Sequence, residues 1–297
     1  MKRCQPASKP KTPRLQIDGI EPLLVPCKPG EFHRGHPRIP PCCGSVSTLR
    51  KGPSLDWPTR LRVAEDAARG LNYLHNDIVP ACLHRDIKPA NILLDANLNA
   101  LVADFGLAKH ISGDASHVET RMAGTFGFMA PECLLSGTAT KAGDVFAFGG
   151  VLLVLITGRA MFVKQAKGNP KTLIQWIFDR THLEDPGEYV DRSLGANFSS
   201  DEAAFLLALA LGCVSRAELR PTMATVLRLL TELRGGKVPC RIGGGAAPPG
   251  GAGHRIWAGN IVRRKRQLLS AFRGQQNEEL GIFYRALGRD APADRFI

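Results

Sequence analysis

Three short motifs carry the residue types that phosphoryl transfer needs. They occur in this order: HRDIKPAN at 84–91, DFG at 104–106 and APE at 130–132. Asp86 could accept a proton from an attacking hydroxyl, with Lys88 as a cation beside it. Asn91 and Asp104 offer the hard oxygen ligands that Mg²⁺ prefers. A single motif would be a weak signal, since a lone Asp is more often a turn former. Three motifs in order predict phosphoryl transfer from ATP.

The two metal ligands are expected at the ends of a β-hairpin. Short apolar segments at 92–94 and 100–102 flank the polar turn DANLN, which is typical of two antiparallel strands. Asn91 directly precedes the first strand, and Asp104 follows the second. The hairpin therefore brings the two ligands together. Leu93, in the first strand, either forms the apolar floor beneath an adenine ring or packs in the core.

Helices are expected on both sides of this hairpin. Apolar residues repeat at intervals of three and four behind the cap Asp56, which predicts an amphipathic helix ending near His75. The apolar segment 141–158 predicts a buried helix. Further helices are predicted around Trp176, over 201–214 behind Ser199 or Ser200, and from Pro221 onward. A short strand at 82–84 leads into HRDIKPAN. The expected fold class is mainly α, with a short hairpin carrying the catalytic and metal-binding loops.

Composition divides the chain into three parts. Residues 1–43 contain nine prolines that interrupt every potential strand or helix, so this basic segment is predicted to be disordered. Residues 44–235 hold the motifs and the helical periodicity and are predicted to form the folded unit. Residues 236–297 open with Gly/Pro-rich, low-complexity sequence and are predicted to be a flexible basic tail.

The net charge of +12 belongs to the two flanks. Residues 1–52 carry ten Lys and Arg against three Asp and Glu, and residues 236–297 carry eleven against four, so the centre is nearly neutral. Solvated tails explain this pattern better than a specific nucleic-acid site does. The alternative is that the basic segment 261–273, IVRRKRQLLSAFR, contacts the nuclear import machinery or an anionic membrane surface.

Cysteine usage and hydropathy favour a cytoplasmic protein. The eight cysteines are scattered without a C-x-x-C pair, as expected in a reducing compartment. The first residues lack the apolar segment of a secretory signal. The apolar runs are about a dozen residues long, shorter than a membrane span requires. No transmembrane segment is therefore expected.

Several segments together resemble a known family. They are LDWPTRLRVAEDAARGLNYLH, HRDIKPANILLD, AGTFGFMAPE, DVFAFG and LGCVSRAELRPTM. These segments are similar to the catalytic domain of plant receptor-like serine/threonine kinases, from Gly44 to Leu233. DVFAFG is similar to the lectin-receptor branch. The resemblance implies a kinase large lobe, ATP and Mg²⁺ as cofactors, a protein substrate, and an upstream kinase or receptor as partner. It also implies that GSVSTLRKGPSLDW forms the helix and loop after the hinge.

The resemblance implies a role for each motif residue. Asp86 would orient and deprotonate the substrate hydroxyl, assisted by Lys88 and Asn91. Four residues would contact ATP or its metal ion: Lys88, Asn91, Leu93 and Asp104. Lysine two residues after the catalytic aspartate marks serine/threonine kinases in this family.

Residues 107–131 are expected to form a polar regulatory loop. Arg85 would bind a phosphate in this loop bidentately and so order it. Thr120 is the first choice for the phosphorylated residue, whereas Thr125 would line the substrate groove. Either threonine could instead carry a solvated hydroxyl.

Three further residues are expected to have structural roles. The resemblance implies a buried ion pair between Glu132 and Arg220. Asp144, near the start of the segment 141–158, would accept hydrogen bonds from the catalytic-loop backbone, because a buried carboxylate must find donors.

The sequence departs from the family before Gly44. A complete kinase has a small lobe with a Gly-rich loop, a strand lysine and a helix glutamate. LLVPCK at 23–28 is the nearest match to the lysine strand, but Pro26 interrupts it, and only fifteen residues separate Lys28 from Gly44. We therefore expect a large lobe without a small lobe. Two hypotheses follow: a kinase truncated or mis-assembled at its start, with doubtful activity, or a non-catalytic kinase-like scaffold that binds partner proteins.

Overall fold

The structure is a computed structural model of the 297-residue chain. It describes residues 24–25, 42–46, 54–111, 117–119, 124–164, 170–180 and 186–237. The longer helices are α1 (Trp57–Asn72), α3 (Lys141–Thr157), α5 (Ser200–Cys213) and α6 (Met223–Arg234), and the short ones are α2 (Pro131–Ser136) and α4 (Leu173–Phe178). The described part is mainly helical, as predicted.

The strands are all short. They are β1 (Leu24–Val25), β2 (Cys42–Ser45), β3 (Cys82–Leu83), β4 (Ile92–Asp95), β5 (Ala100–Ala103), β6 (Lys109–His110), β7 (His117–Glu119), β8 (Thr138–Thr140), β9 (Phe162–Val163) and β10 (Lys171–Thr172). Antiparallel pairs form between β3 and β6, β7 and β8, and β9 and β10. Residues 107–131, predicted as a loop, therefore contribute two strands to such pairs.

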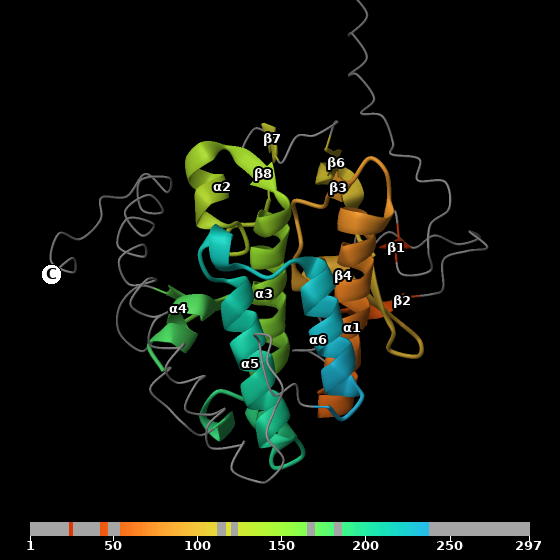
Figure 1. Ribbon diagram of the computed structural model, residues 1–297. Coiled ribbons are helices and arrows are strands. Elements are labelled where there is room, and N and C mark those ends of the chain that lie inside the picture. The colour runs from red at the N-terminus through yellow and green to blue at the C-terminus, as the bar shows by residue number, and fades with distance from the viewer. Residues whose placement is uncertain are drawn as a thin grey trace, which may run out of the picture.

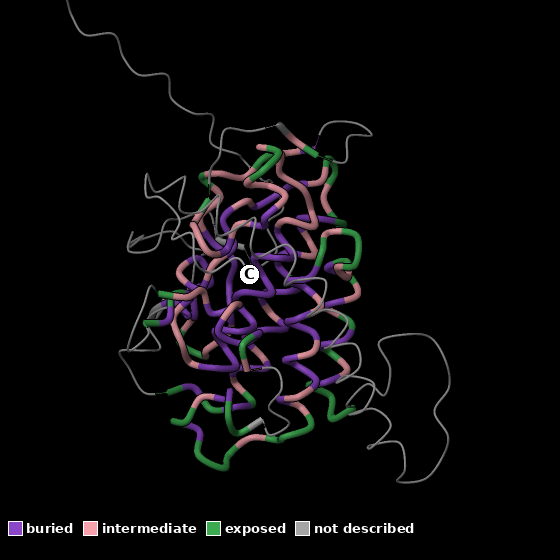
Figure 2. Tube along the Cα trace, turned by 90° about the vertical axis from the view of Figure 1, so that its left-hand side faces the viewer, coloured by how far each residue is buried: buried purple, intermediate pink, exposed green. Residues whose placement is uncertain are grey.

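Helix α3 occupies the centre of the described structure (Figure 1). Every residue from Asp144 to Thr157 is buried. It packs against α1, α4 and α5, while α1 packs against α6 and β5. A helix that is apolar all round needs neighbours on every side, and these helices provide them. The buried part of the trace runs through the interior of the helical layers (Figure 2).

Helix α1 follows its sequence pattern closely. The Asp56 side chain accepts a hydrogen bond from the Thr59 amide at 2.9 Å and caps the helix. The apolar stripe, which includes Leu61, Ala64 and Leu71, is buried in the core. Beyond Asn72 the chain continues as one turn of π-helix to Asp77 instead of ending near His75.

The predicted hairpin is present, but it is part of a larger sheet. Strands β4 and β5 pair antiparallel, with Ile92 opposite Val102 and Leu94 opposite Ala100. Strand β1 adds to β5 in parallel and β2 adds to β4, which gives the order β1-β5-β4-β2. The outward-facing backbone groups of a two-stranded hairpin can accept further strands, and both edges are used here.

Three local predictions were wrong. Leu24 and Val25 form β1 inside the segment predicted to be disordered, because two residues between prolines suffice for one short pairing. Gly44 and Ser45 belong to β2, so the helix expected from Gly44 does not begin there. Helix α6 begins at Met223 with Thr222 as its cap, because the Thr222 hydroxyl accepts from the Thr225 amide at 3.3 Å. Within the described ranges, no helix is long and apolar enough to cross a membrane.

Candidate active site

The loop between β3 and β4 holds Asp86 in a closed set of hydrogen bonds. Asp86 is 8% exposed. Its Oδ1 accepts from the Thr125 hydroxyl at 2.7 Å, and its Oδ2 accepts from Lys88 Nζ at 2.6 Å. Lys88 Nζ also donates to Thr125 Oγ1 at 2.7 Å. A carboxylate, an ammonium group and a hydroxyl thus meet in one triangle, although Thr125 lies 39 positions from Asp86.

Asn91 extends this network and leaves one atom unused. Its Nδ2 donates to the Asp86 carbonyl at 2.8 Å and to Asp86 Oδ2 at 3.1 Å. The side chain is fully buried, and its Oδ1 has no hydrogen-bond partner. An unsatisfied buried acceptor costs about 1–3 kcal/mol, so such an atom calls for an explanation. A ligand that supplies a positive charge or a donor would satisfy Asn91 Oδ1.

Asp104 stands at the other end of the hairpin in a left-handed backbone conformation. Its φ is 65°, which Asp tolerates better than bulkier residues do. The side chain caps the short 3₁₀ turn Phe105–Leu107 by accepting from the Gly106 amide at 3.4 Å. The carboxylate is only partly buried, so it keeps lone pairs free for a further ligand.

The two residues fit a magnesium ion that also binds phosphate. Among the described residues there is no group of three or more His, Cys, Asp or Glu that could hold a metal. Mg²⁺ often takes one or two protein oxygens and completes its shell with water and substrate phosphates. The unpaired Asn91 Oδ1 and the Asp104 carboxylate match that donor set.

His84 connects the catalytic loop to the segment of Asp104. Its Nε2 lies 3.0 Å from the Ala103 carbonyl, and its Nδ1 accepts from the Asp86 amide at 3.3 Å. Burial lowers the pKa of His84, so the ring is neutral at pH 7. The carbonyl can only accept and the amide can only donate, so the proton sits on Nε2. The ring also contacts Phe105, with centroids 5.2 Å apart.

Asp144 of α3 holds the catalytic loop from below. Its two oxygens accept from the His84 amide at 2.8 Å, the Arg85 amide at 2.8 Å and His75 Nε2 at 3.0 Å. Burial raises the pKa of Asp144, but the hydrogen bond from His75 together with the neighbouring charges and the Arg85 amide outweighs burial and brings the pKa below its ordinary value. Asp144 therefore remains a carboxylate in the core, in the position that the sequence suggested.

Arg85 is anchored to the chain segment after Asp104. Its backbone φ is 71°, and its Nη1 donates to the Leu107 carbonyl at 2.8 Å. A guanidinium at this point borders the start of segment 107–131. Thr120 lies outside the described residues, so its relation to Arg85 remains a prediction.

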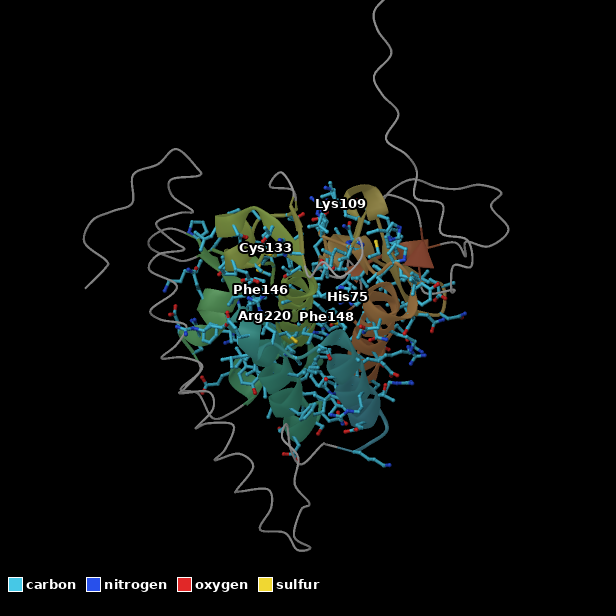
Figure 3. All side chains as sticks on the ribbon, turned by 45° about the horizontal axis from the view of Figure 1, so that its top comes forward. His75, Lys109, Cys133, Phe146, Phe148 and Arg220 are labelled. Atoms are coloured by element: carbon cyan, nitrogen blue, oxygen red, sulfur yellow. The ribbon has the colours of Figure 1, made fainter. Side chains whose placement is uncertain are left out.

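Glu132 and Arg220 form the expected contact. Arg220 Nη1 and Nη2 donate to the two carboxylate oxygens at 2.5 and 2.9 Å. The Arg220 side chain is 1% exposed, whereas that of Glu132 is 30% exposed, so the pair is buried from the arginine side. Arg220 also packs over the Phe146 ring at 5.0 Å and donates to the Ala142 carbonyl (Figure 3).

Leu93 lies on the face of the sheet that points away from the main core. Ile92 and Leu94 belong to the core cluster, while Leu93 and its pairing partner Leu101 do not. Leu93 is nevertheless only 6% exposed. This alternation separates it from the core, and its contact with an adenine ring remains a prediction.

A cavity lies beside Asp86, between the catalytic loop and the start of α3. It encloses about 520 Å³ of empty space, part of which is open to solvent. Its walls include Asp86, Thr125, Phe128, Cys133 and Thr138. Most of the exposed wall surface is apolar, and the polar lining residues include Asp86, Thr125 and Thr138. The cavity therefore places apolar surface next to a carboxylate that already accepts a hydroxyl.

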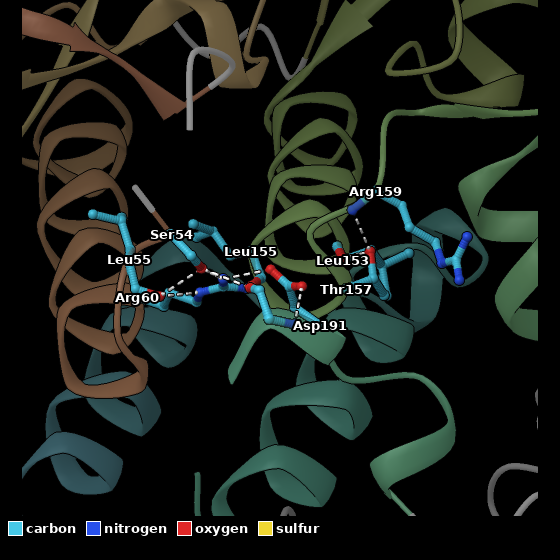
Figure 4. Close-up of polar contacts among 9 residues, drawn as sticks. Ser54, Leu55, Arg60, Leu153, Leu155, Thr157, Arg159 and Asp191 are labelled. Carbon is cyan, nitrogen blue, oxygen red and sulfur yellow. Dashed lines mark hydrogen bonds and ion pairs between the residues drawn. The ribbon is translucent and has the colours of Figure 1, made fainter. Parts of the chain in front are cut away.

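Sequence reasoning missed several residues that hold the site in place. His75 binds Asp144 with its ring and accepts from Lys141 Nζ with its carbonyl. Arg60 of α1 is 5% exposed and donates to Asp191 at 2.5 Å and to the Leu155 carbonyl at 2.8 Å (Figure 4). A charged residue on the apolar stripe of a predicted helix was the available signal for Arg60, since such a residue is rarely buried unpaired.

Comparisons with known proteins agree with this geometry. The protein kinase domain model matches residues 48–228, which is more than half of the chain. Three similar proteins come from Arabidopsis thaliana. A proline-rich receptor-like protein kinase is 43% identical over 61% of this chain, a probable LRR receptor-like serine/threonine-protein kinase is 41% identical over 59%, and a putative L-type lectin-domain containing receptor kinase is 40% identical over 61%.

The aligned part is a small share of those relatives. The chain spans 24%, 19% and 27% of their lengths, respectively. The matched region contains the catalytic loop, the DFG and APE segments and the central helix described above. The chain therefore belongs to the protein kinase family, and plant receptor-like kinases are among its relatives.

Proposed function

We propose that residues 44–235 are the large lobe of a serine/threonine protein kinase, which transfers the γ-phosphate of ATP to Ser or Thr hydroxyls of a protein substrate. The observation that carries the proposal is the buried network at Asp86. The network leaves Asn91 Oδ1 unpaired beside a carboxylate that already accepts a threonine hydroxyl. An unsatisfied buried acceptor is uncommon in a purely structural network, and a bound ligand would account for it.

Asp86 acts on the substrate hydroxyl. The Thr125 hydroxyl donates to Asp86 Oδ1 at 2.7 Å, which supports the idea that an aliphatic hydroxyl fits at this carboxylate. A substrate hydroxyl in the neighbouring cavity would be oriented in the same manner. Asp86 would take its proton as the new P–O bond forms and the bond between the γ-phosphorus and the bridging oxygen breaks, which releases ADP. Lys88, 2.6 Å from Asp86, would place its charge on the phosphoryl oxygens.

Asn91 and Asp104 hold the metal. When bound, Mg²⁺ neutralises charge on the phosphate oxygens during transfer. Asn91 contributes the unpaired Oδ1, and its Nδ2 keeps that oxygen in position through two bonds to Asp86. Asp104 contributes a carboxylate at the end of β5. Leu93 is proposed as an apolar contact for the adenine ring, on the sheet face away from the core.

The proposal extends to the regulation of the kinase and to its partners. Arg85 would receive a phosphate in the segment 107–131, with Thr120 as the phosphorylated residue and an upstream kinase or receptor as the source. Thr125 would serve the substrate groove. The proposed setting is cytoplasmic, with the basic segment 261–273 as a possible contact for a membrane surface or import receptor.

A second candidate function is a kinase-like scaffold that binds partner proteins without catalysis. The observation that favours it lies in the sequence. No Gly-rich loop and no lysine strand precede Gly44 in the printed chain. Without these parts, one wall of the nucleotide cleft would be open to water, and charges at Asp104, Asn91 and Lys88 would be screened. We therefore expect the chain as printed to transfer phosphate far more slowly than a complete kinase.

The experiment compares four proteins in a radiolabelled-phosphate assay on a generic basic protein. These are the printed chain and a fusion in which the small lobe of a related kinase precedes Gly44, each with and without Asp86→Ala. Activity in the fusion that falls about 10²–10⁴-fold with Asp86→Ala supports the kinase proposal. Activity in the chain alone that depends on Asp86 contradicts the expected slow transfer. An inactive fusion that folds and binds Mg-ATP contradicts catalysis and favours the scaffold.

A further inference from the structure

Two arginines enclose the Trp176 side chain of α4. The Arg159 guanidinium lies 4.2 Å from the ring centroid, and the Arg180 guanidinium lies 4.3 Å from it. Trp176 is 7% exposed and belongs to the hydrophobic core cluster, so the ring is a fixed platform for the two guanidinium groups. A guanidinium stacked on a ring has a fixed plane, and its N–H groups point outward along the edges. The two arginines are thus held in place before any ligand arrives.

A third arginine stands beside them. Arg192 follows Asp191, whose amide donates to the Ile156 carbonyl at 2.9 Å and so fixes this segment at the end of α3. Arg159 also follows the end of α3, and its own amide donates to Thr157 Oγ1 at 3.1 Å. Burial first, and then the charges of Arg180 and Arg192, lower the pKa of Arg159, and the smaller opposing effect of the Asp191 charge does not offset them. Three like charges are therefore close enough to repel one another.

The neighbouring carboxylates that the structure describes are engaged elsewhere. Asp191 is paired with Arg60, and Asp179 is paired with Lys171 at 2.6 Å. The Arg159 guanidinium extends away from Asp191 (Figure 4). Within the described ranges, Arg159 and Arg192 have no side-chain hydrogen bond or ion pair, and Arg180 donates only to the Trp176 carbonyl at 3.5 Å.

We propose that Arg159, Arg180 and Arg192 form a binding site for a phosphorylated serine or threonine in a protein segment. The three side chains are called the arginine cluster below. Arginine binds phosphate through paired N–H donors, and a phosphate monoester offers three acceptor oxygens and nearly two negative charges. Binding would satisfy the free donors and remove the repulsion between the three cations.

The compact shape of the cluster favours a phosphopeptide over a membrane or a nucleic acid. Two of the three guanidinium groups lie over one aromatic side chain, and Arg192 follows the segment that Asp191 fixes at the end of α3. A membrane surface or a polynucleotide is usually met by an extended basic surface that contacts many phosphates. The cluster is built by α4, the end of α3 and the turn at Arg192, none of which contributes to the Asp86 network. The inference is thus independent of catalysis at Asp86.

The test measures binding of a fluorescent peptide to the full 297-residue chain at a fixed salt concentration of 150 mM. One peptide carries a single phosphothreonine, and its match carries threonine. One or more added charge-assisted hydrogen bonds predict about tenfold tighter binding of the phosphopeptide. The double variant Arg159→Gln/Arg180→Gln should reduce this preference to about twofold or less, as expected when the charge-assisted bonds are lost.

Two single variants are compared: Arg192→Gln is the test, and Arg228→Gln is its control. Arg192 does not stack on Trp176, so its removal should weaken phosphopeptide binding several-fold without lowering the unfolding midpoint. Arg228 on α6 is 60% exposed and pairs with Glu232, so Arg228→Gln removes the same charge from another surface. It should leave the preference unchanged. This control also separates the cluster from non-specific binding to the basic flanks.

Four outcomes would overturn the proposal. The first is equal affinity for the two peptides. The second is a preference that survives Arg159→Gln/Arg180→Gln and Arg192→Gln in folded protein. The third is binding to vesicles with anionic lipid, or to inorganic phosphate, that matches the phosphopeptide. The fourth concerns Glu184 and Asp185, which lie outside the described residues and are changed in the variant Glu184→Gln/Asp185→Asn. A preference for the phosphopeptide that appears only in this variant would show that the chain's own acids occupy the arginine cluster.

Discussion

Two buried carboxylates, Asp86 and Asp144, lie on either side of the same loop, and they differ in how completely their surroundings are satisfied. Asp144 accepts three hydrogen bonds, from the His75 ring and from the amides of His84 and Arg85, and these bonds form without a ligand. Asp86 accepts from a lysine, a threonine and an asparagine, and that asparagine keeps an unpaired oxygen. The first arrangement is complete without a ligand, and the second is not. Completeness therefore distinguishes the group that supports the loop from the groups that we propose to act in catalysis.

The largest expected effect on stability comes from removing the Asp144 carboxylate, whose hydrogen bonds are complete without a ligand. Asp144→Ala would leave three buried donors without acceptors, and we expect a loss of about 3–5 kcal/mol in the free energy of unfolding. That is a large part of the stability of a typical domain. Denaturant unfolding followed by circular dichroism measures it. Asp144→Asn should cost less, because the amide retains one acceptor oxygen, and an equal cost for both variants would contradict this account.

The next effect concerns the ion pair that ties α2 to the last helices. Glu132→Ala would leave Arg220, 1% exposed, with only backbone carbonyls as acceptors. We expect a loss of about 3 kcal/mol, at the low end for a broken buried pair, because Glu132 is partly exposed.

The matched control for this variant is Glu232→Ala. Glu232 pairs with Arg228 on the surface of α6, four residues apart. Removing an exposed pair of this kind costs about 0.3–0.5 kcal/mol. If the two variants have the same unfolding midpoint, the Glu132–Arg220 pair does not act as a buried pair.

The variant Asn91→Leu tests the Asp86 network, in which one acceptor is unpaired. It removes two hydrogen bonds to Asp86 but also the unpaired acceptor, so we expect a stability change of at most about 1–2 kcal/mol. In the fusion with a small lobe, Mg-ATP should raise the unfolding midpoint of the parent but not of Asn91→Leu. The readout is thermal unfolding with and without Mg²⁺. An equal shift in both proteins would exclude Asn91 as a ligand.

The smallest effect is a dependence on pH. The folded pKa of Asp144 lies below the ordinary value of 3.8, so the unfolded chain binds this proton more readily than the folded chain does. The stabilisation is therefore fully present above about pH 4 and is lost as the pH falls through the folded pKa. The unfolding midpoint of the parent should decline more steeply below pH 4 than that of Asp144→Asn. If the unfolding midpoints of the two proteins decline in parallel below pH 4, this prediction is contradicted.

The sequence predicted elements well where local pattern decides the structure. The cap Asp56, the periodic stripe behind it and the polar DANLN turn specify α1 and the β4–β5 hairpin. Strands β1 and β2 were missed because two to four residues carry no usable periodicity. Whether they form depends on the free edges of a distant hairpin.

The sequence places the candidate site residues near one another, and the resemblance implies the contact of Asp144 with the catalytic-loop backbone, but the hydrogen bond between Thr125 and Asp86 was not predicted. HRDIKPAN places Asp86, Lys88 and Asn91 within six positions, so their proximity follows from the chain. Thr125 and Asp144 join them from 39 and about 60 positions away. No local pattern specifies such distances. The unpaired Asn91 oxygen likewise depends on three-dimensional packing.

Helix α3 has a consequence for the synthesis of this protein. All its residues from Asp144 to Thr157 are buried in the folded protein. Each face of the helix therefore needs a packing partner to shield it from water. Its neighbour α5 ends at Cys213, 56 positions after Thr157. At roughly 5–20 residues per second, a ribosome needs roughly 3–11 s to supply that stretch. During this interval α1 is already present, but the apolar surface of α3 that packs against α5 stays uncovered in the nascent chain.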